Sequence, residues 1–329
     1  MKNLDFGRYL LGSLVVAAML AACGGSQPPI GAPGTMPQGP EVATHTGRGG
    51  SWMLPEAKAG GLIYAAGGCG SVCVFSFPKA KLVGSLDVAD PNGACSDSGG
   101  NVYIVGEPDV FEYAHGGTNP IRTLTLPPDA MAQSCAVDPT TGDVAVTGDL
   151  VYGDVAVFTP GSGSPTTYTV SDGAMWSGYD NEGNLFVDGY KPSSKSIPLS
   201  ELAHGASQFI SVSTSGLTAR AGEVQWDGKY LTVEGADDDG SVLVYRLSVQ
   251  GYTATLIGTT ATTTHGERAA LASWIEGNHI LIPYGTHASR TNKLGVWNYP
   301  AGGKPIRKDF RGVDGRPAFQ GVTYSVASK

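Results

Sequence analysis

The hexapeptide NLFVDG, residues 184–189, is one copy of a strand-like unit that recurs along most of this 329-residue chain. The other clear copies are NVYIVG (101–106), DVAVTG (143–148), KYLTVEG (229–235) and NHILIPYG (278–285), and successive copies start 41 to 49 residues apart. Each copy follows a segment that ends in Asp or another polar residue and a tight glycine turn, as in GYDNEGN and QWDGK. A period of about 40 to 50 residues with four strands per unit is typical of a β-propeller.

Five of these repeats can be divided into four strands each, with the innermost strand first. They cover residues 93–126, 134–170, 175–213, 223–259 and 270–310. Gly321–Ala327 (GVTYSVA) is left as a lone innermost strand, whereas residues 61–88 supply three strands without an innermost one. Joining the two chain ends would complete a sixth blade and leave no open edge. We therefore predict an all-β fold, a six-bladed β-propeller closed by a 1+3 strap.

The composition agrees with such a fold and limits the partners. Only 15% of the residues are charged, against about 25% in typical domains. The 48 glycines, with abundant Thr, Ser and Val, suit short strands joined by tight turns. The formal net charge is -8 and no block of basic residues occurs, so we expect no nucleic-acid partner.

The first 23 residues have the features of a bacterial lipoprotein signal. Lys2 and Arg8 supply positive charge, and the apolar run 9–22 is shorter than the roughly 20 residues that a transmembrane helix needs. The run ends in Leu-Ala-Ala-Cys, which places Cys23 to accept a diacylglyceryl group. We predict a signal peptide over residues 1–22 and lipidation of Cys23. The alternatives are an ordinary secretory signal with a chance cysteine, or an uncleaved anchor.

Residues 23–59 are predicted to be the lipidated cysteine and a tether, because the segment is rich in Pro and Gly and has few large apolar residues. Residues 60–329 are predicted to form the propeller. One lipidated cysteine anchors a protein to a membrane without spanning it, so we expect a location in the bacterial cell envelope. Gly24 in place of Asp after the lipidated cysteine resembles outer-membrane sorting in Gram-negative bacteria.

The repeated Asp-turn-Gly-Asn strand starts resemble those of NHL-repeat, YVTN-repeat and gluconolactonase-type propellers. More specifically, GYDNEGNLFVDG, QWDGKYLTV, EYAHGG and NYPAGG resemble segments of a group of bacterial lipoprotein propellers. The resemblance covers nearly the whole mature chain and implies the fold, but the same fold carries many unrelated activities. Gluconolactonase-type enzymes hold a divalent metal at the channel mouth, and no set of positions here matches their carboxylate and Asn ligands.

Four cysteines remain besides Cys23, and an even number in an exported protein predicts disulfides with three possible pairings. Cys69 and Cys73 flank a strand hairpin and could meet across its tip. Cys95 and Cys135 lie at offsets that turn them to opposite faces of neighbouring innermost strands, so they could join two blades. The alternative is that all four are buried free thiols, which pack as small apolar side chains.

A binding site is expected at the channel mouth, on the face whose loops differ from blade to blade. Arginines on that face would suit a carboxylate or phosphate ligand, unless they pair with surface acids nearby. Tyrosines there could stack on a sugar or a peptide, or could cap the core. The candidate ligand-binding residues are Arg220, Arg268, Arg316, Tyr152, Tyr190 and Tyr284.

Metal binding has weaker support in the sequence, and no cofactor is predicted. Asp237 and Asp239, in the run DDDG, could bind Ca²⁺, but the run lacks the Glu of an EF-hand and also suits an ordinary turn. A second group could be imagined as metal ligands or as a general base, although no motif spacing supports it. Its members are His265, Glu267, His279 and His287.

Two classes of function fit these features, and neither includes an identified catalytic residue. The first is a membrane-tethered scaffold that presents its variable face to a glycan, a peptide or an envelope protein. The second is a periplasmic metal-dependent hydrolase or lyase with its site at the channel mouth. The sequence has no G-x-S-x-G motif, so it gives no support to a serine hydrolase of that type. The binding scaffold is favoured.

Overall fold

The chain divides into two units, residues 1–47 and 48–329. The computed structural model describes the following residues, all in the second unit: 50–67, 69, 71–128, 130–150, 154–189, 197–217, 220–236, 241–264, 268–269, 272–285, 293–311 and 319–327. The predicted signal peptide and Cys23 therefore lie outside the described residues. In the part of the chain that is described, no helix is long and apolar enough to cross a membrane.

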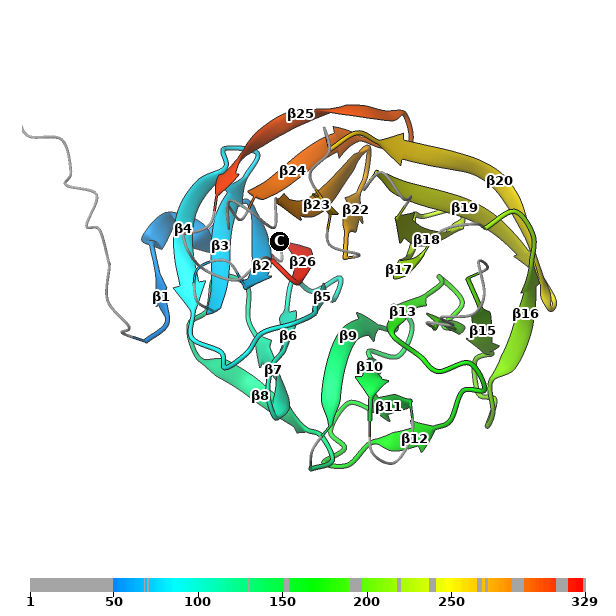
Figure 1. Ribbon diagram of the computed structural model, residues 1–329. Helices are drawn as coiled ribbons and strands as arrows, with labels where there is room; N and C mark the ends of the chain where they lie inside the picture. Colours follow the sequence, from blue (N-terminus) through cyan, green and yellow to red (C-terminus); the bar gives the residue numbers. More distant parts are fainter. Residues whose placement is uncertain are drawn as a thin grey trace, which may run out of the picture. The chain divides into compact units, whose positions relative to one another are not determined.

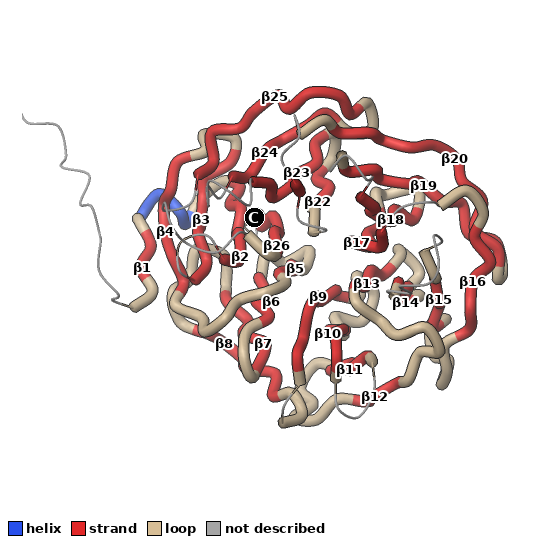
Figure 2. The backbone as a smooth tube through the Cα atoms, in the orientation of Figure 1, coloured by secondary structure: helices blue, strands red, loops and turns tan. Residues whose placement is uncertain are grey.

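Among the described residues, strands make up almost all of the regular structure (Figure 2), and the one short exception is the 3₁₀ helix η1 (Pro55–Lys58). Two sheets contain four strands each, in chain order. The first is β5 (Ala94–Ser96), β6 (Val102–Val105), β7 (Asp109–Tyr113) and β8 (Pro120–Thr125). The second is β9 (Met131–Val137), β10 (Val144–Asp149), β11 (Val155–Phe158) and β12 (Thr166–Tyr168).

The next three repeats form similar antiparallel groups, and their outermost strands pair in parallel to link them into one larger sheet. The first group is β13 (Trp176–Tyr179), β14 (Leu185–Asp188), β15 (Leu199–Leu202) and β16 (Ile210–Thr214). The second is β17 (Arg220–Trp226), β18 (Leu231–Ala236), β19 (Val242–Gln250) and β20 (Thr253–Thr262). The third is β21 (Arg268–Ala269), β22 (Trp274–Glu276), β23 (His279–Gly285), β24 (Lys293–Asn298) and β25 (Gly302–Arg311).

The last sheet combines the two ends of the described chain, in the order β1-β4-β3-β2-β26. Its strands are β1 (Trp52–Met53), β2 (Gly61–Gly67), β3 (Ser71–Phe77), β4 (Lys81–Leu86) and β26 (Gly321–Val326). β26 pairs antiparallel with β2, with Tyr324 opposite Ile63. β1 pairs with β4, so the sheet begins before residue 60, where the sequence placed the start of the domain.

The innermost strands lie around a common centre (Figure 1), and each contacts the next in the order β26, β5, β9, β13, β17, β22 and back to β26. Gly178 shows how closely they approach, because a Cβ at this position would overlap the carbonyl oxygen of Val224 on β17. The second strands β6 and β14 are buried along their whole length. This burial on both faces explains why VYIV and LFVD are almost continuously apolar rather than alternating.

The turns that follow two of the third strands form hydrogen bonds to the neighbouring sheets. In EYAHGG, His115 Nδ1 shares a 2.7 Å hydrogen bond with Ser325 Oγ of β26. In NYPAGG, the Tyr299 hydroxyl donates a 2.5 Å hydrogen bond to Asp227 at the end of β17. The repeated motifs therefore join each of these turns to the sheet beside it.

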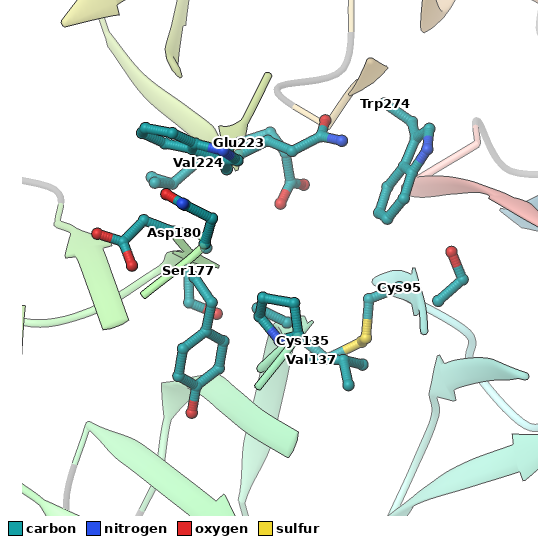
Figure 3. Close-up of a pocket in the computed structure, with 16 residues that line it drawn as sticks. Cys95, Cys135, Val137, Ser177, Asp180, Glu223, Val224 and Trp274 are labelled. Atoms are coloured by element: carbon teal, nitrogen blue, oxygen red, sulfur yellow. A yellow bond between two sulfur atoms is a disulfide. The ribbon is translucent and has the colours of Figure 1, made fainter. Parts of the chain in front are cut away.

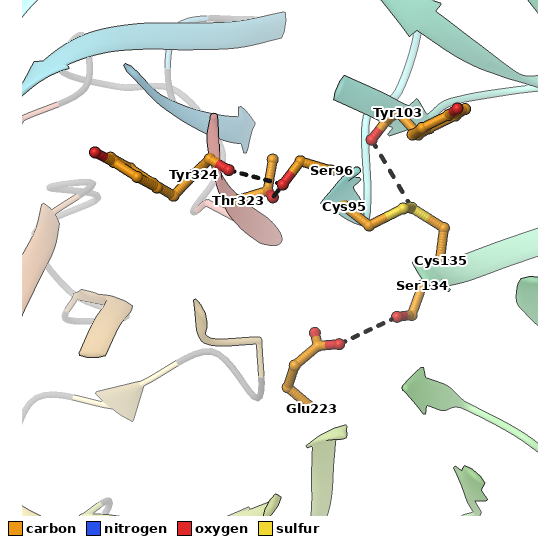
Figure 4. The surroundings of a disulfide bond; sticks show 8 residues. All are labelled: Cys95, Ser96, Tyr103, Ser134, Cys135, Glu223, Thr323 and Tyr324. Carbon is orange, nitrogen blue, oxygen red and sulfur yellow. Dashed lines mark hydrogen bonds between the residues drawn. A yellow bond between two sulfur atoms is a disulfide. The ribbon is translucent and has the colours of Figure 1, made fainter. Parts of the chain in front are cut away.

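The structure contains both predicted disulfides. Cys69 is bonded to Cys73 at the β2–β3 hairpin, with a Cα–Cα distance of 5.5 Å. Cys95 of β5 is bonded to Cys135 of β9, with a Cα–Cα distance of 5.7 Å, so this bond joins two sheets (Figure 4). Both distances lie within the usual range for disulfides.

Candidate functional site

The repeated aspartates at the ends of the innermost strands stabilise turns. Asp180, for example, accepts hydrogen bonds of 2.9 Å from the backbone N–H groups of Glu182 and Asn184, and Asn184 Nδ2 also donates to it. The same use of an Asp carboxylate in a local turn occurs in three other repeats, at Asp97, Asp138 and Asp227. The repeated aspartates that reveal the fold in the sequence therefore have a structural role, because their carboxylates accept hydrogen bonds within their own turns.

A cavity of about 250 Å³ lies between the innermost strands of five repeats. Its lining comes from β5, β9, β13, β17 and β22, together with the turns that follow β9 and β13. Figure 3 shows the Cys95–Cys135 disulfide on one side of this space and the Trp274 ring directed toward it. Trp226 and Tyr179 add further aromatic surface to the lining. No Lys, Arg or His occurs among the described lining residues.

A β-bulge brings one carboxyl into this cavity. The register between β17 and β18 shifts between Ala221 and Val224, so that Gly222 and Glu223 together face Glu234. Such a bulge re-aims side chains, and here it directs Glu223 toward the centre (Figure 3). The hydroxyl of Ser134 on β9 donates a long hydrogen bond of 3.5 Å to Glu223 Oε1 (Figure 4).

Two further carboxyls lie close to Glu223, behind the residues that line the cavity. Asp188 at the end of β14 and Glu234 on β18 are 0% and 1% exposed, and none of their four oxygens has a hydrogen bond of normal geometry among the described residues. Among the described residues, neither carboxyl takes part in an ion pair. Ionised carboxylates in such surroundings are costly, so these groups are expected to hold their protons.

The pKa values of the three groups shift accordingly. Burial raises the pKa of Glu234 to about 8, with a small opposing effect from Ser273. Burial also raises the pKa of Asp188 well above its usual range, and the Glu234 carboxyl adds to the rise while the backbone amides of Gly222 and Trp176 oppose it. The pKa of Glu223 is raised well above its usual range by burial first, then by Glu234 and Asp188, while the Ser134 hydroxyl lowers it.

Most other polar groups of the cavity are already engaged. Gln225 Nε2 donates to the carbonyl oxygen of Ile275 at 2.9 Å, and its Oε1 accepts from the Ile275 N–H at 2.7 Å. Ser96 Oγ donates to the Tyr324 carbonyl oxygen at 2.7 Å (Figure 4). The Ser177 hydroxyl, only 1% exposed, lines the cavity and has no hydrogen-bond partner in the described structure. Among the described lining residues, Glu223 therefore keeps a carboxyl with one long hydrogen bond, and Ser177 Oγ and Trp274 Nε1 lack hydrogen-bond partners.

The predicted arginine and tyrosine site can be followed only in part. Arg220 begins β17 and Arg268 begins β21, at the same end of their strands as expected, but their side chains are outside the described residues. Arg316, Tyr152 and Tyr190 are also outside them. Tyr284 is 7% exposed, its ring lies edge to face with Trp297 at 5.7 Å, and Lys293 Nζ lies 5.6 Å from its centroid. Tyr284 therefore packs against the core, as in the alternative in which these tyrosines cap the core rather than stack on a ligand.

The predicted metal residues are mostly outside the described chain, including Asp237, Asp239, His265, Glu267 and His287. His279 lies in β23 with its ring 5.7 Å from that of Phe77, in an edge-to-face arrangement. Among the described residues, no three His, Cys, Asp or Glu side chains come together in a way that could hold a metal ion.

No protein-family model matches this sequence, and a search of curated proteins finds no match. Solved structures resemble the fold at low identity. A chain of the nidogen/laminin complex matches with a TM-score of 0.56 and 12% identity, over 82% of this chain and 100% of that one. A TolB-like protein from Agrobacterium tumefaciens matches with a TM-score of 0.52 and 11% identity, over 80% and 96%. Against a hydrazine synthase chain from Kuenenia stuttgartiensis, this chain spans 64% of that chain's length and 65% of its own, at 14% identity and a TM-score of 0.49.

The fold is of the β-propeller type. The neighbours with a TM-score above 0.5 are propeller proteins, and at 11–12% identity they support the fold alone. Three residues of the cavity lining were not among the site residues predicted from the sequence, namely Glu223, Ser177 and Trp274. In the sequence, Glu223 is only one of the acidic residues close to a predicted arginine, here Arg220. The strand pattern alone gives no sign of the bulge that turns it into the cavity.

Proposed function

We propose that this chain is a membrane-tethered, extracytoplasmic propeller that binds a ligand or partner through the cavity between its innermost strands. A glycan, a peptide or another envelope protein would be the partner. The observation that carries the proposal is Glu223, a carboxyl that a bulge directs into a cavity and to which the described residues give one long hydrogen bond. A carboxyl that faces a cavity and contributes little to the stability of the fold is a candidate for ligand binding.

The proposed architecture is a six-bladed propeller closed by a 1+3 strap. The pairing of β26 with β2 supports it, because a strand from the end of the chain completes a sheet that begins near residue 52. The order of contacts among the innermost strands, which returns to its starting strand, also supports it. Such closure would give the rigid frame that a binding site on loops and inner strands requires.

The tether is proposed from the sequence around Cys23 and would hold the propeller at the outer membrane. Replacing Cys23 by Ser is expected to move the protein from the membrane fraction to the soluble fraction, because the acyl chains would have no attachment site. Fractionation of cells that express each form checks this. Equal amounts in the membrane fraction would contradict the lipid anchor and favour the uncleaved-signal alternative.

Binding by the cavity can be tested with the full-length protein in detergent on glycan and peptide arrays. We expect a defined set of bound probes that the Val137→Phe variant loses, because Val137 lines the cavity and a larger ring would fill it. Ile257→Phe is the matched control, since Ile257 is 48% exposed on β20 away from the cavity. Equal binding by all three forms would show that the cavity is not the site.

The second candidate is the periplasmic hydrolase or lyase. One observation favours it, since a carboxyl with a raised pKa such as Glu223 could protonate a leaving group. A metal for such an enzyme would have to be bound with help from segments outside the described residues, such as 237–240 and 286–292. One tightly held divalent ion per chain, measured by mass spectrometry after purification without chelator, would favour the enzyme over the scaffold.

A further inference from the structure

The charge distribution around the cavity is one-sided. Glu223 lines the cavity, Asp188 and Glu234 lie behind it, and no basic side chain occurs among the described lining residues. Three neighbouring carboxyls without a counter-charge are stable only while they hold their protons or while a cation compensates them. The site would therefore favour a positively charged ligand and disfavour an anion.

The walls of the cavity fit an organic cation better than a bare metal ion. Trp226, Trp274 and Tyr179 line the same space as the carboxyl of Glu223, and Figure 3 shows the Trp274 side chain directed into this space. Ammonium groups bind the faces of such rings, and Trp is the strongest partner among them. The volume of about 250 Å³ is far larger than a single ion, and the described side chains offer no cluster of three metal ligands.

A polar group of the ligand would also have a partner. The buried Ser177 hydroxyl lines the cavity and lacks a hydrogen-bond partner in the described structure. Because an unsatisfied buried hydroxyl is costly, a ligand that offers a hydroxyl or carbonyl beside its charge would recover that free energy. This favours a small cation with one short polar substituent.

We propose that the cavity binds a small organic ammonium ion, with Glu223 as its counter-charge and Trp226 and Trp274 as its aromatic wall. This inference rests on the proposed function, because it names the ligand class of the same cavity. It does not depend on the identity of the natural ligand, only on the charge and size that the lining selects.

Binding of this kind releases a proton. Burial and the neighbouring Glu234 and Asp188 carboxyls raise the pKa of Glu223 in the free protein, whereas a bound cation would lower it, so binding would pass protons to the buffer at pH values between the two. The affinity should rise with pH until Glu223 is ionised in the free protein. The titratable groups that act on it are Asp188 from β14 and Glu234 from β18, and Asp180 and Tyr179 line the same cavity. None of these groups is basic, and the Arg220 side chain is outside the described residues.

Calorimetric titration of the full-length protein with choline, and with its uncharged isostere 3,3-dimethyl-1-butanol, tests the proposal. We expect choline to bind at least about tenfold more tightly than the isostere, since only choline gains the cation–π and carboxylate interactions. Titrations in buffers of different ionisation enthalpy should show proton release on choline binding, with about one proton per choline as the upper limit. Glu223→Gln should remove both the preference and the proton release, whereas Glu182→Gln, at an exposed turn position, should change neither.

The possible outcomes separate the two proposals. Equal affinity for choline and the isostere, or binding without proton release, would overturn the ammonium site. If choline does not bind while array probes still bind in a Val137-dependent way, the binding function stands and the ligand class proposed here is wrong. If neither choline nor any array probe binds, both proposals fail. Near-ultraviolet circular dichroism shows whether Glu223→Gln keeps the native fold.

Discussion

Replacing Cys95 and Cys135 together by Ala is expected to lower the free energy of unfolding by about 4 kcal/mol. The bond joins β5 to β9 across a sequence separation of 40 residues, and both cysteines are almost fully buried. A cross-link over that many residues removes much of the conformational entropy of the unfolded chain. Urea unfolding of the full-length variant and the wild type, followed by tryptophan fluorescence, measures the difference.

The Cys69–Cys73 bond provides the matched control within the same chain. It spans a sequence separation of only 4 residues, so the same relation predicts a loss of about 2 kcal/mol for the corresponding double Ala variant. Equal losses in the two variants would contradict loop closure as the source of the stabilisation. A large loss with the 69/73 pair alone would indicate that the β2–β3 hairpin depends on its bond for local structure.

Replacing Glu234 by Gln is expected to raise the free energy of unfolding at pH 9, on the order of 4 kcal/mol relative to the wild type. Glu234 is 1% exposed, and burial raises its pKa from 4.5 to about 8. The folded state therefore binds this proton more tightly than the unfolded state. The resulting stability is fully present below about pH 4.5 and is lost as the pH rises through about 8. Glutamine has no proton to lose, so the variant should not show this loss.

Urea unfolding at intervals between pH 5 and pH 9 measures the effect. The wild type should lose stability across this range, and Glu234→Gln should have a shallower slope, with the remaining slope due to Asp188 and Glu223. Glu182→Gln is the control, because Glu182 is exposed and should leave the slope unchanged. Parallel curves for the wild type and Glu234→Gln would show that Glu234 ionises normally in the folded protein.

The site itself could be predicted from the sequence only in part. The offsets of Cys95 and Cys135 in neighbouring repeats made their pairing one of several possibilities, because alternate residues of a strand face opposite sides, and the bond itself is seen only in the structure. The position of Glu223 could not be obtained in this way. It depends on a bulge that shifts the register of β17 against β18, and such a shift leaves the alternation of apolar and polar residues unchanged in the sequence. The proximity of Asp188 and Glu234 likewise depends on how two repeats pack.

The sequence by itself determined the all-β repeat architecture, because the period of the strands and turns is a local property of the chain. The Asp residues at the ends of the innermost strands can also be recognised locally, since each carboxylate accepts hydrogen bonds from backbone N–H groups within a few residues. Only the tertiary structure decided which side chains meet at the centre. Glu223, Ser134 and Trp274 come from three different repeats, and their distance and burial depend on packing between sheets, which no local pattern records.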